Sequence, residues 1–346
     1  MGQIIIKKAM ALFFVLVFLT GCSSTKLPQE ESSSSIPVLD EEQETDFSMP
    51  ENTIIGTVSH GPSIETQYEE DGITPLPFEY NGGIFSLPYE VSVEGVSTNI
   101  GFLVFWDGTP VAYDVGDGTE ASYCHTFTQN EKKEKLSFSI RFTPTGRAGE
   151  RHTLTVASIY NPDYKPDMKN SSSYGAYHNI VCCVRPVYLS VDPPVSSSQS
   201  ETFHTVKELT VTEEELTHDF LEKNLSVLYG MRELTMETLD KQVYFADLIN
   251  GELVFDNYAI SNEPVSAELC LCGTDGKSYA VTLYLDHQPV CETQRLTVHK
   301  GKITRLSVSI DPAVIKDSST AYFVAVPLDE EDSVNVVKSR SILLYK

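Results

Sequence analysis

The sequence predicts an all-β protein made of two tandem β-sandwich domains that are related by an internal repeat. Three observations support this fold class. Residues 136–142 alternate between apolar and polar side chains, which is the period of a strand with one buried face. Residues 101–106 form a continuous apolar run that ends at the turn dipeptide Asp107-Gly108, so they predict a strand buried on both faces. Both features recur, in the same order, in the second half of the chain.

The internal repeat consists of four short matches between the two halves. Any one of them is short enough to arise by chance, but four matches in one order indicate two related domains. The matched pairs are 102–111 with 281–290, 136–140 with 306–310, Val156-Ala157 with Val324-Ala325, and 185–189 with 340–344.

The repeat divides the chain into a first domain at 52–191, a linker at 192–199 and a second domain at 200–346. Several short strands with turns between them favour an immunoglobulin-like sandwich for both domains. Residues 213–222 allow two interpretations. They could form a helix that begins at a capping box, with Thr212 and Glu215 as its polar residues, or they could form a sandwich strand.

The first 21 residues have the parts of an export signal. A basic start at Lys7 and Lys8 is followed by an apolar run at 9–19, and this run is shorter than the roughly 20 apolar residues that span a bilayer. The run ends at Leu19-Thr20-Gly21-Cys22, which resembles the lipobox of bacterial lipoproteins. The predicted lipoprotein signal peptide is therefore residues 1–21. The alternative is an ordinary signal peptide followed by a cysteine that stands there by chance.

The resemblance to bacterial lipoproteins implies that a diacylglycerol is joined to the sulfur of Cys22 and that the chain is cut just before this residue. More than one acyl chain anchors a protein stably, whereas a single chain binds only marginally. We therefore expect a protein held by lipid on the extracytoplasmic side of a cell membrane. Residues 22–51 are rich in Ser, Glu, Asp and Gln and poor in apolar groups, so they predict a disordered acidic tether.

The charge of the chain excludes one class of partner. The formal net charge is −24, and it becomes −26 when Lys7 and Lys8 leave with the signal. Binding to nucleic acid needs Lys and Arg to displace counterions, so nucleic acid is not expected as a partner. The expected partners are the membrane, through the lipid, and an envelope glycan or protein.

Six cysteines remain besides Cys22. Cys270 and Cys272 should face one side of a strand, whereas the adjacent Cys182 and Cys183 should face opposite sides. The simplest interpretation is that the six are small buried apolar residues. A disulfide from Cys270 or Cys272 to Cys291 stays open, because connectivity cannot be read from sequence.

The sequence contains no motif of a known catalytic or cofactor site, so neither an enzyme nor a cofactor is expected. There is no G-x-S-x-G elbow, H-E-x-x-H motif or Walker loop. The eight histidines show no metal-ligand spacing and are expected at the surface. Asp114, Asp117 and Glu120 lie on a Gly-rich stretch whose oxygens suit calcium, although the spacing is not that of an EF-hand. A solvated turn is the competing interpretation.

The most informative segment is residues 160–178, which are longer than their counterpart in the second copy. They contain Tyr160, Tyr164, Tyr174 and Tyr177 among Ser, Asn and Gly. Rigid amphipathic rings among small polar residues are typical of binding loops. The competing interpretation is a long surface connection whose tyrosines cover the end of the sandwich.

Together these features predict a lipid-anchored, non-catalytic protein of the cell envelope that acts in binding, adhesion or assembly. Two other functions stay open. An envelope hydrolase acting on glycan or peptide would need a cleft of convergent polar groups. A structural subunit of a surface apparatus would need an exposed apolar patch on a sandwich face.

Overall fold

The computed structural model describes residues 55–96, 99–116, 118–129, 133–166, 178–194, 206–230, 234–329 and 335–346. The predicted signal peptide, Cys22 and most of the predicted tether lie outside the described residues, as do Asp117, Tyr174 and Tyr177. Within the described part, no helix is both long and apolar enough to cross a bilayer.

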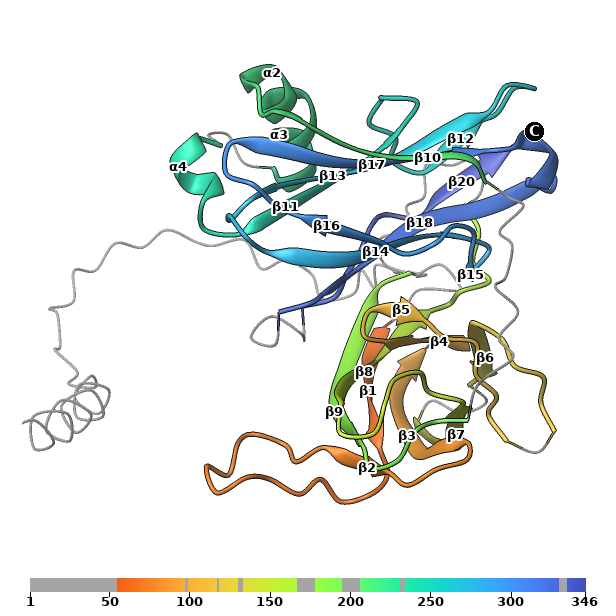
Figure 1. Ribbon diagram of the computed structural model, residues 1–346. Coiled ribbons are helices and arrows are strands. Elements are labelled where there is room, and N and C mark those ends of the chain that lie inside the picture. Colours follow the sequence, from red (N-terminus) through yellow and green to blue (C-terminus); the bar gives the residue numbers. More distant parts are fainter. Residues whose placement is uncertain are drawn as a thin grey trace, which may run out of the picture. The chain divides into compact units, whose positions relative to one another are not determined.

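The first half of the described chain forms two sheets (Figure 1). Its strands are β1 (Ile55–Pro62), β2 (Phe78–Tyr80), β3 (Phe85–Val96), β4 (Asn99–Trp106), β5 (Thr109–Pro110), β6 (Cys124–Thr128), β7 (Lys133–Phe142), β8 (Arg151–Tyr160) and β9 (Ile180–Leu189). One sheet has the order β1-β3-β7. The other has the order β2-β9-β8-β4-β5, with β6 paired to β4.

The second half also forms two sheets. Its strands are β10 (Val206–Glu215), β11 (Val243–Ile249), β12 (Asn257–Ala259), β13 (Val265–Gly273), β14 (Ser278–Leu285), β15 (Gln288–Pro289), β16 (Gln294–Thr297), β17 (Lys302–Ile310), β18 (Ser318–Pro327), β19 (Val337–Lys338) and β20 (Ile342–Tyr345). The first sheet has the order β10-β17-β13-β11. The second has the order β12-β20-β18-β14-β15, with β16 paired to β14 and β19 to β18.

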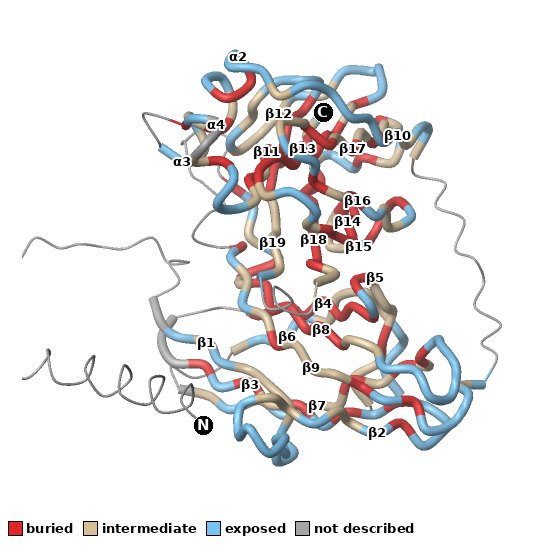
Figure 2. The backbone as a smooth tube through the Cα atoms, turned by 60° about the vertical axis from the view of Figure 1, so that its left-hand side comes forward, coloured by how far each residue is buried: buried red, intermediate tan, exposed pale blue. Residues whose placement is uncertain are grey.

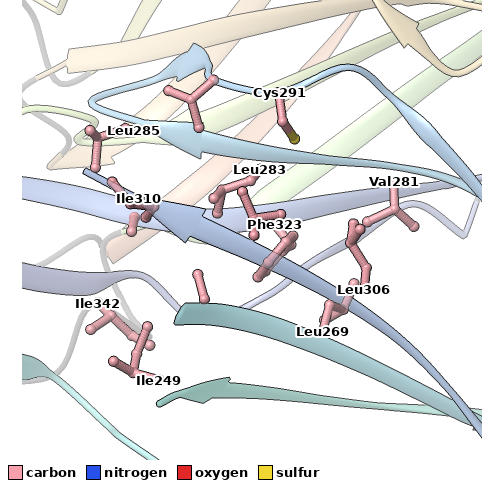
Figure 3. Packing of buried hydrophobic residues seen from close by; sticks show 14 of the residues in the cluster. Ile249, Leu269, Val281, Leu283, Leu285, Cys291, Leu306, Ile310, Phe323 and Ile342 are labelled. Carbon is pink, nitrogen blue, oxygen red and sulfur yellow. The ribbon is translucent and has the colours of Figure 1, made fainter. Parts of the chain in front are cut away.

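Each half buries its own hydrophobic core between its two sheets. In the second half, Leu283 and Phe323 from one sheet lie against Leu269 and Leu306 from the other (Figure 3). The first half has a separate core built in the same way from its own two sheets. The predicted all-β class of two tandem sandwiches is confirmed. Residues 49–346 form one compact unit, so the exact domain limits stay a prediction.

The strand pairing confirms the internal repeat. The equivalent strands are β1 and β11, β2 and β12, β3 and β13, β4 and β14, β5 and β15, β6 and β16, β7 and β17, β8 and β18, and β9 and β20. In each half one pair of strands is parallel, namely β2 with β9 and β12 with β20. The other pairs are antiparallel.

The first sequence match is confirmed in detail, and the second lies on the equivalent strands β7 and β17. The turns after β4 and β14 have the same left-handed backbone, with φ of 50° at Asp107 and 49° at Asp286. The carboxylate of Asp107 accepts the Thr153 N–H and that of Asp286 accepts the Thr320 N–H, at 2.8 and 2.9 Å. Each aspartate therefore braces its turn against the neighbouring strand, and Thr153 is equivalent to Thr320.

The third match is wrong by one residue. Because Thr153 is equivalent to Thr320, Val156 is equivalent to Phe323, whereas the sequence match paired it with Val324. A shift of one residue moves a strand's side chains to the opposite face. Val156 accordingly lies in the first core, while Val324 faces out of the second sandwich.

The fourth match is wrong by two residues. Leu154 pairs with Arg185, and its equivalent Ala321 pairs with Ile342. Arg185 is therefore equivalent to Ile342 and not to Arg340. An even shift keeps each residue on the same face of the strand.

The helix expected at 213–222 begins later than predicted. Strand β10 continues to Glu215, and α2 (His218–Phe220) begins at Thr217, whose Oγ1 accepts the Phe220 N–H at 3.2 Å. The segment continues through a π-helical turn, η2 (Leu221–Leu225), into α3 (Ser226–Tyr229). The short helix α4 (Met236–Leu239) follows before β11. The capping threonine is thus not the one predicted.

The cysteines are free thiols throughout the described part. Cys270 and Cys272 share the face of β13 that lies under the helices, whereas Cys291 belongs to the core between the sheets. A disulfide from either residue to Cys291 is therefore wrong, because the sheet separates them. The predicted opposite orientation of Cys182 and Cys183 is confirmed by their places in two different clusters.

Candidate binding site at the junction of the two sandwiches

The outward faces of β4 and β8 pack against those of β14 and β18 and form a buried apolar junction (Figure 2). Phe105 meets its own equivalent, Tyr284, with ring centroids 6.5 Å apart in an edge-to-face arrangement. Tyr284 also stacks on Tyr322 at 5.4 Å. Contact between equivalent residues is typical of two-fold symmetric dimer interfaces, and here it occurs within one chain.

The turns that follow β4 and β14 reach across this junction. Gly108 has φ of 79°, and a Cβ added there would lie 2.5 Å from the Cβ of Ala280. Only glycine allows this approach without a shift of the backbone. The equivalent residue, His287, also has positive φ (64°), and its imidazole contacts the first sandwich.

The loop between β8 and β9, residues 161–179, begins at the junction. Asn161 has φ of 43° and donates its N–H to Asn99 O at 3.0 Å. Asn161 Oδ1 accepts the Asn99 N–H at 3.2 Å. Further along, Lys165 Nζ donates to Ser318 O at 3.2 Å and to Ser318 Oγ at 3.1 Å. The start of the loop is therefore fixed to both sandwiches.

Two histidines hold the backbone of this loop, and we name them the histidine clamp. His287 Nε2 donates to Pro162 O at 2.7 Å, and His178 Nε2 donates to Tyr164 O at 3.1 Å. Because a carbonyl oxygen can only accept, each Nε2 must carry the proton. The Nδ1 atoms then accept, from Tyr322 OH at 2.9 Å and from Ser341 Oγ at 2.8 Å. Burial lowers the pKa of both histidines, which favours this neutral form.

Lys338 lies behind the histidine clamp. Its Nζ donates to Ser341 Oγ at 2.8 Å and to Ser339 O at 3.0 Å, and it lies 4.3 Å from the centre of the Tyr322 ring. Burial lowers the Lys338 pKa to about 7, although Asp247 acts in the opposite direction. Burial also lowers the His178 pKa to about 2, and the charges of Lys338 and His287 add to this effect. Burial lowers the pKa of His287 as well.

The histidine clamp closes the loop on itself. Tyr164 O and His178 Nε2 are in hydrogen-bond contact, so two described residues near the two ends of the loop lie side by side. Loops whose ends are held close together frequently carry function. The fixed ends of this loop also reduce the entropy that a ligand would have to overcome on binding.

The structure brings two of the four predicted tyrosines to the base of this loop. Tyr160 ends β8, is half-buried, and has a pKa raised by burial. Tyr164 is half-buried, with its ring centroid 6.4 Å from that of His178. Tyr174 and Tyr177 lie outside the described residues, so their role stays a prediction.

The predicted calcium-binding stretch contains one hydrogen-bonded carboxylate, Asp114, and one exposed carboxylate, Glu120. Asp114 Oδ1 accepts the Gly116 N–H at 3.0 Å and lies 3.5 Å from Arg141 Nη1. Glu120 is exposed. Across the described residues, no group of three His, Cys, Asp or Glu side chains could hold a metal ion. With Asp117 outside that part, the calcium site stays a prediction without a described ligand cluster.

The expectation that the histidines lie at the surface is wrong for several of them. His178 is buried, with 3% of its surface exposed, and His60, His125, His152 and His287 are half-buried. His178 and His287 are 109 positions apart in the sequence, yet their ring centroids lie only 5.8 Å apart. Sequence spacing could not reveal this pair, because it forms only when the two sandwiches pack.

One pair resembles a catalytic dyad but has a structural explanation. His152 Nδ1 lies 2.6 Å from Asp107 Oδ2. In the second half the equivalent carboxylate, Asp286, accepts a hydrogen bond from Ser319, the residue equivalent to His152. Both carboxylates thus brace equivalent turns. The nearby cleft of about 450 Å³ contains threonines, Arg295 and Asp329 but no cysteine or serine nucleophile among its lining residues.

A second insertion of the first half carries exposed apolar side chains. Residues 63–77 form a hairpin, with Leu76 N donating to Gln67 O at 2.8 Å, where the second half has only residues 250–256. Ile73 and Tyr68 keep 79% and 52% of their surface exposed. The sequence analysis did not identify this hairpin.

Comparisons with known proteins found no matching family model and no matching curated protein. Among solved structures, a protein of unknown function from Porphyromonas gingivalis is similar, with a TM-score of 0.22, 10% identity, and coverage of 78% of this chain and 96% of that one. The Salmonella enterica SafA pilin in complex with the SafB chaperone has a TM-score of 0.21 and 7% identity, covering 85% and 98%. The C-terminal domain of the Streptococcus agalactiae AgI/II polypeptide BspA has a TM-score of 0.20 and 11% identity, covering 84% and 100%. These likenesses are slight, and the fold described above rests on the strands and their pairing.

Proposed function

We propose that this chain is a lipid-anchored, non-catalytic binding protein of the cell envelope and that the loop between β8 and β9 contacts its ligand. The observation that carries the proposal is the closed base of the loop, where both ends are held by the histidine clamp. A tyrosine-rich loop on a rigid base combines adaptable polar contacts with little ordering cost. An envelope glycan or protein is the expected ligand class, because tyrosine faces stack on sugars and anchor protein interfaces.

Tyr164 and Tyr174 offer two different tests of this proposal. Tyr164 packs against His178, so its replacement by alanine should lower stability as well as any affinity. Tyr174, which follows Tyr164 by ten positions in the sequence, is the sharper test. Once an envelope glycan or protein ligand has been found by array, Tyr174→Ala should weaken binding by roughly thirtyfold, as expected for an anchor worth about 2 kcal/mol. Its unfolding free energy should change by less than about 0.5 kcal/mol.

Tyr68→Ala is the matched control, because Tyr68 is an exposed tyrosine of the first half on a different loop. Affinity is measured by titration and stability by urea denaturation. Tyr68→Ala should leave affinity unchanged. If Tyr174→Ala binds as tightly as the wild type, the loop is not the site.

The lipid anchor has its own test. Cys22→Ala should release the protein into the soluble fraction or leave the signal uncut, because the sulfur that accepts the diacylglycerol is gone. Cell fractionation and metabolic labelling with a radioactive fatty acid measure this result. A processed, lipid-labelled membrane protein carrying Cys22→Ala would contradict the anchor.

A further inference from the structure

Strands β7 and β17 occupy equivalent places in the two sandwiches and have nearly the same sequence. Both read Leu-Ser-x-Ser-Ile, at 136–140 and 306–310. Leu136 pairs with Val91 of β3, and Leu306 pairs with Leu269 of β13, the strand equivalent to β3. A difference between the outer edges of β7 and β17 therefore indicates what β7 lacks.

The edge of β17 that faces away from β13 is paired with another strand, whereas the equivalent edge of β7 is largely open. Strand β10 pairs with β17 along the whole strand. Beside β7, in the described part of the chain, only the end is covered, where Arg141 and Asp114 exchange backbone hydrogen bonds at 2.9 and 3.0 Å. Because edge-facing groups alternate along a strand, those of Ser137 and Ser139 point the same way as those of Arg141. Among the described residues they have no strand partner.

The apolar side chains beside this edge lack the cover that their equivalents have. Leu306 and Val308 of β17 are completely buried. Val206 and Leu209 of β10 pack against the core to which they belong. The equivalents in β7, Leu136 and Phe138, are only partly buried. A strand with apolar residues at alternate positions would complete their burial.

The ion pairs of β7 and β17 also differ in the way expected if β7 lacks a partner strand. Lys135 is equivalent to Arg305, and its ion pair with Glu90 at 2.7 Å is equivalent to the pair of Arg305 with Glu268. Arg305 also binds a second carboxylate, Glu214 of β10. No second carboxylate is bound to Lys135 in the described part.

We infer that the open edge of β7 accepts an extended strand from another polypeptide, one that alternates apolar residues and carries an acidic residue diagonal to Lys135, as Glu214 is diagonal to Arg305. The added strand runs antiparallel to β7, as β10 runs antiparallel to β17. Main-chain hydrogen bonds from Ser137 and Ser139 supply affinity, and the half-buried Leu136 and Phe138 select apolar side chains. Strand β10 pairs with β17 in this way and supplies Glu214 to Arg305, so a peptide of residues 206–216 is the probe.

The test measures binding of the fluorescently labelled 206–216 peptide to the full chain by anisotropy. The key variant is Ser137→Pro, which removes an edge-facing N–H but leaves the bonds of β7 to β3 intact. Binding should weaken at least tenfold, while Ser137→Ala, which keeps the N–H, should bind as the wild type does. Lys135→Glu should also weaken binding.

Three results would overturn the proposal. The peptide could fail to bind the wild type at up to about 1 mM, the low-affinity end of the scale for specific binding. It could bind Ser137→Pro as well as the wild type, which would place it at β17 by exchange with β10. The wild type could also dimerise in sedimentation while Ser137→Pro is a monomer, which would make a second copy of this chain the occupant. Circular dichroism and a melting curve verify that Ser137→Pro is folded.

Discussion

Replacing Tyr284 with alanine should lower the free energy of unfolding by about 3–5 kcal/mol, the usual cost of removing a large buried aromatic side chain. Tyr284 is 1% exposed and lies at the centre of the junction, where it meets Phe105 and stacks on Tyr322. The cavity would open between the sandwiches and not within either core. We therefore also expect the single melting transition to separate into two, because each sandwich keeps its own core.

Tyr188→Ala is the matched control for this change. Tyr188 is 38% exposed on β9, so the same truncation should cost less than about 0.5 kcal/mol. Calorimetry and urea denaturation measure both variants. A loss below about 1 kcal/mol with one cooperative transition would show that the junction contributes little to stability.

The sequence predicted the sandwiches because each depends on local periodicity. Alternation at 136–142 and the continuous run at 101–106 correspond to β7 and to the doubly buried β4. The turn at Asp107 was visible because its residues need a left-handed backbone. What the short matches could not fix was register. Val-Ala pairs occur by chance, and only the hydrogen bonds of Thr153 and Thr320 reveal the one-residue shift.

The candidate site was predictable only in part. The extra length and tyrosine content of residues 160–178 identified the loop. The two histidines that hold it, His178 and His287, and Lys338 behind them come from three places in the sequence and meet only when two outward sheet faces pack together. No periodicity distinguishes an outward face that will be buried by a second sandwich from one that stays in water. The same limitation hid the open edge of β7, which is defined by the absence of a neighbour.

The free energy of unfolding should fall by about 2 kcal/mol between pH 7.5 and pH 5 through His178 alone, since one pKa unit corresponds to about 1.4 kcal/mol. His178 in the folded protein has its pKa lowered to about 2 from 6.5. Below pH 6.5 the unfolded chain therefore binds a proton that the folded chain does not. Stability is complete above pH 6.5 and is lost progressively as the pH falls toward 2. The lowered pKa of His287 acts in the same direction.

Above pH 7, the titrations of Lys338 and of the buried thiols should change the free energy of unfolding in opposite directions. The Lys338 pKa is lowered to about 7 from 10.5, so the unfolded chain holds the extra proton between these values and stability rises with pH there. Burial raises the pKa of the Cys124 and Cys182 thiols to about 12 from 9.0. Above pH 9 the unfolded thiols lose protons that the folded ones keep, which lowers stability. Urea denaturation at intervals from pH 5 to pH 10 should therefore show a maximum near pH 8–9.

His178→Gln identifies the source of the acid branch. Glutamine does not titrate, so this variant should be less stable than the wild type at pH 8 but should lose about 2 kcal/mol less between pH 7.5 and pH 5. His218→Gln is the control, because His218 is an exposed histidine of α2 outside the junction, and it should leave the pH profile unchanged. The expected loss of stability at low pH comes from the histidine clamp. A protonated His178 can no longer accept the Ser341 hydroxyl, and it would place a positive charge beside Lys338 and His287. An acid branch equally steep in His178→Gln would mean that the clamp does not carry the acid sensitivity, and it would remove the argument that neutral imidazoles hold the loop.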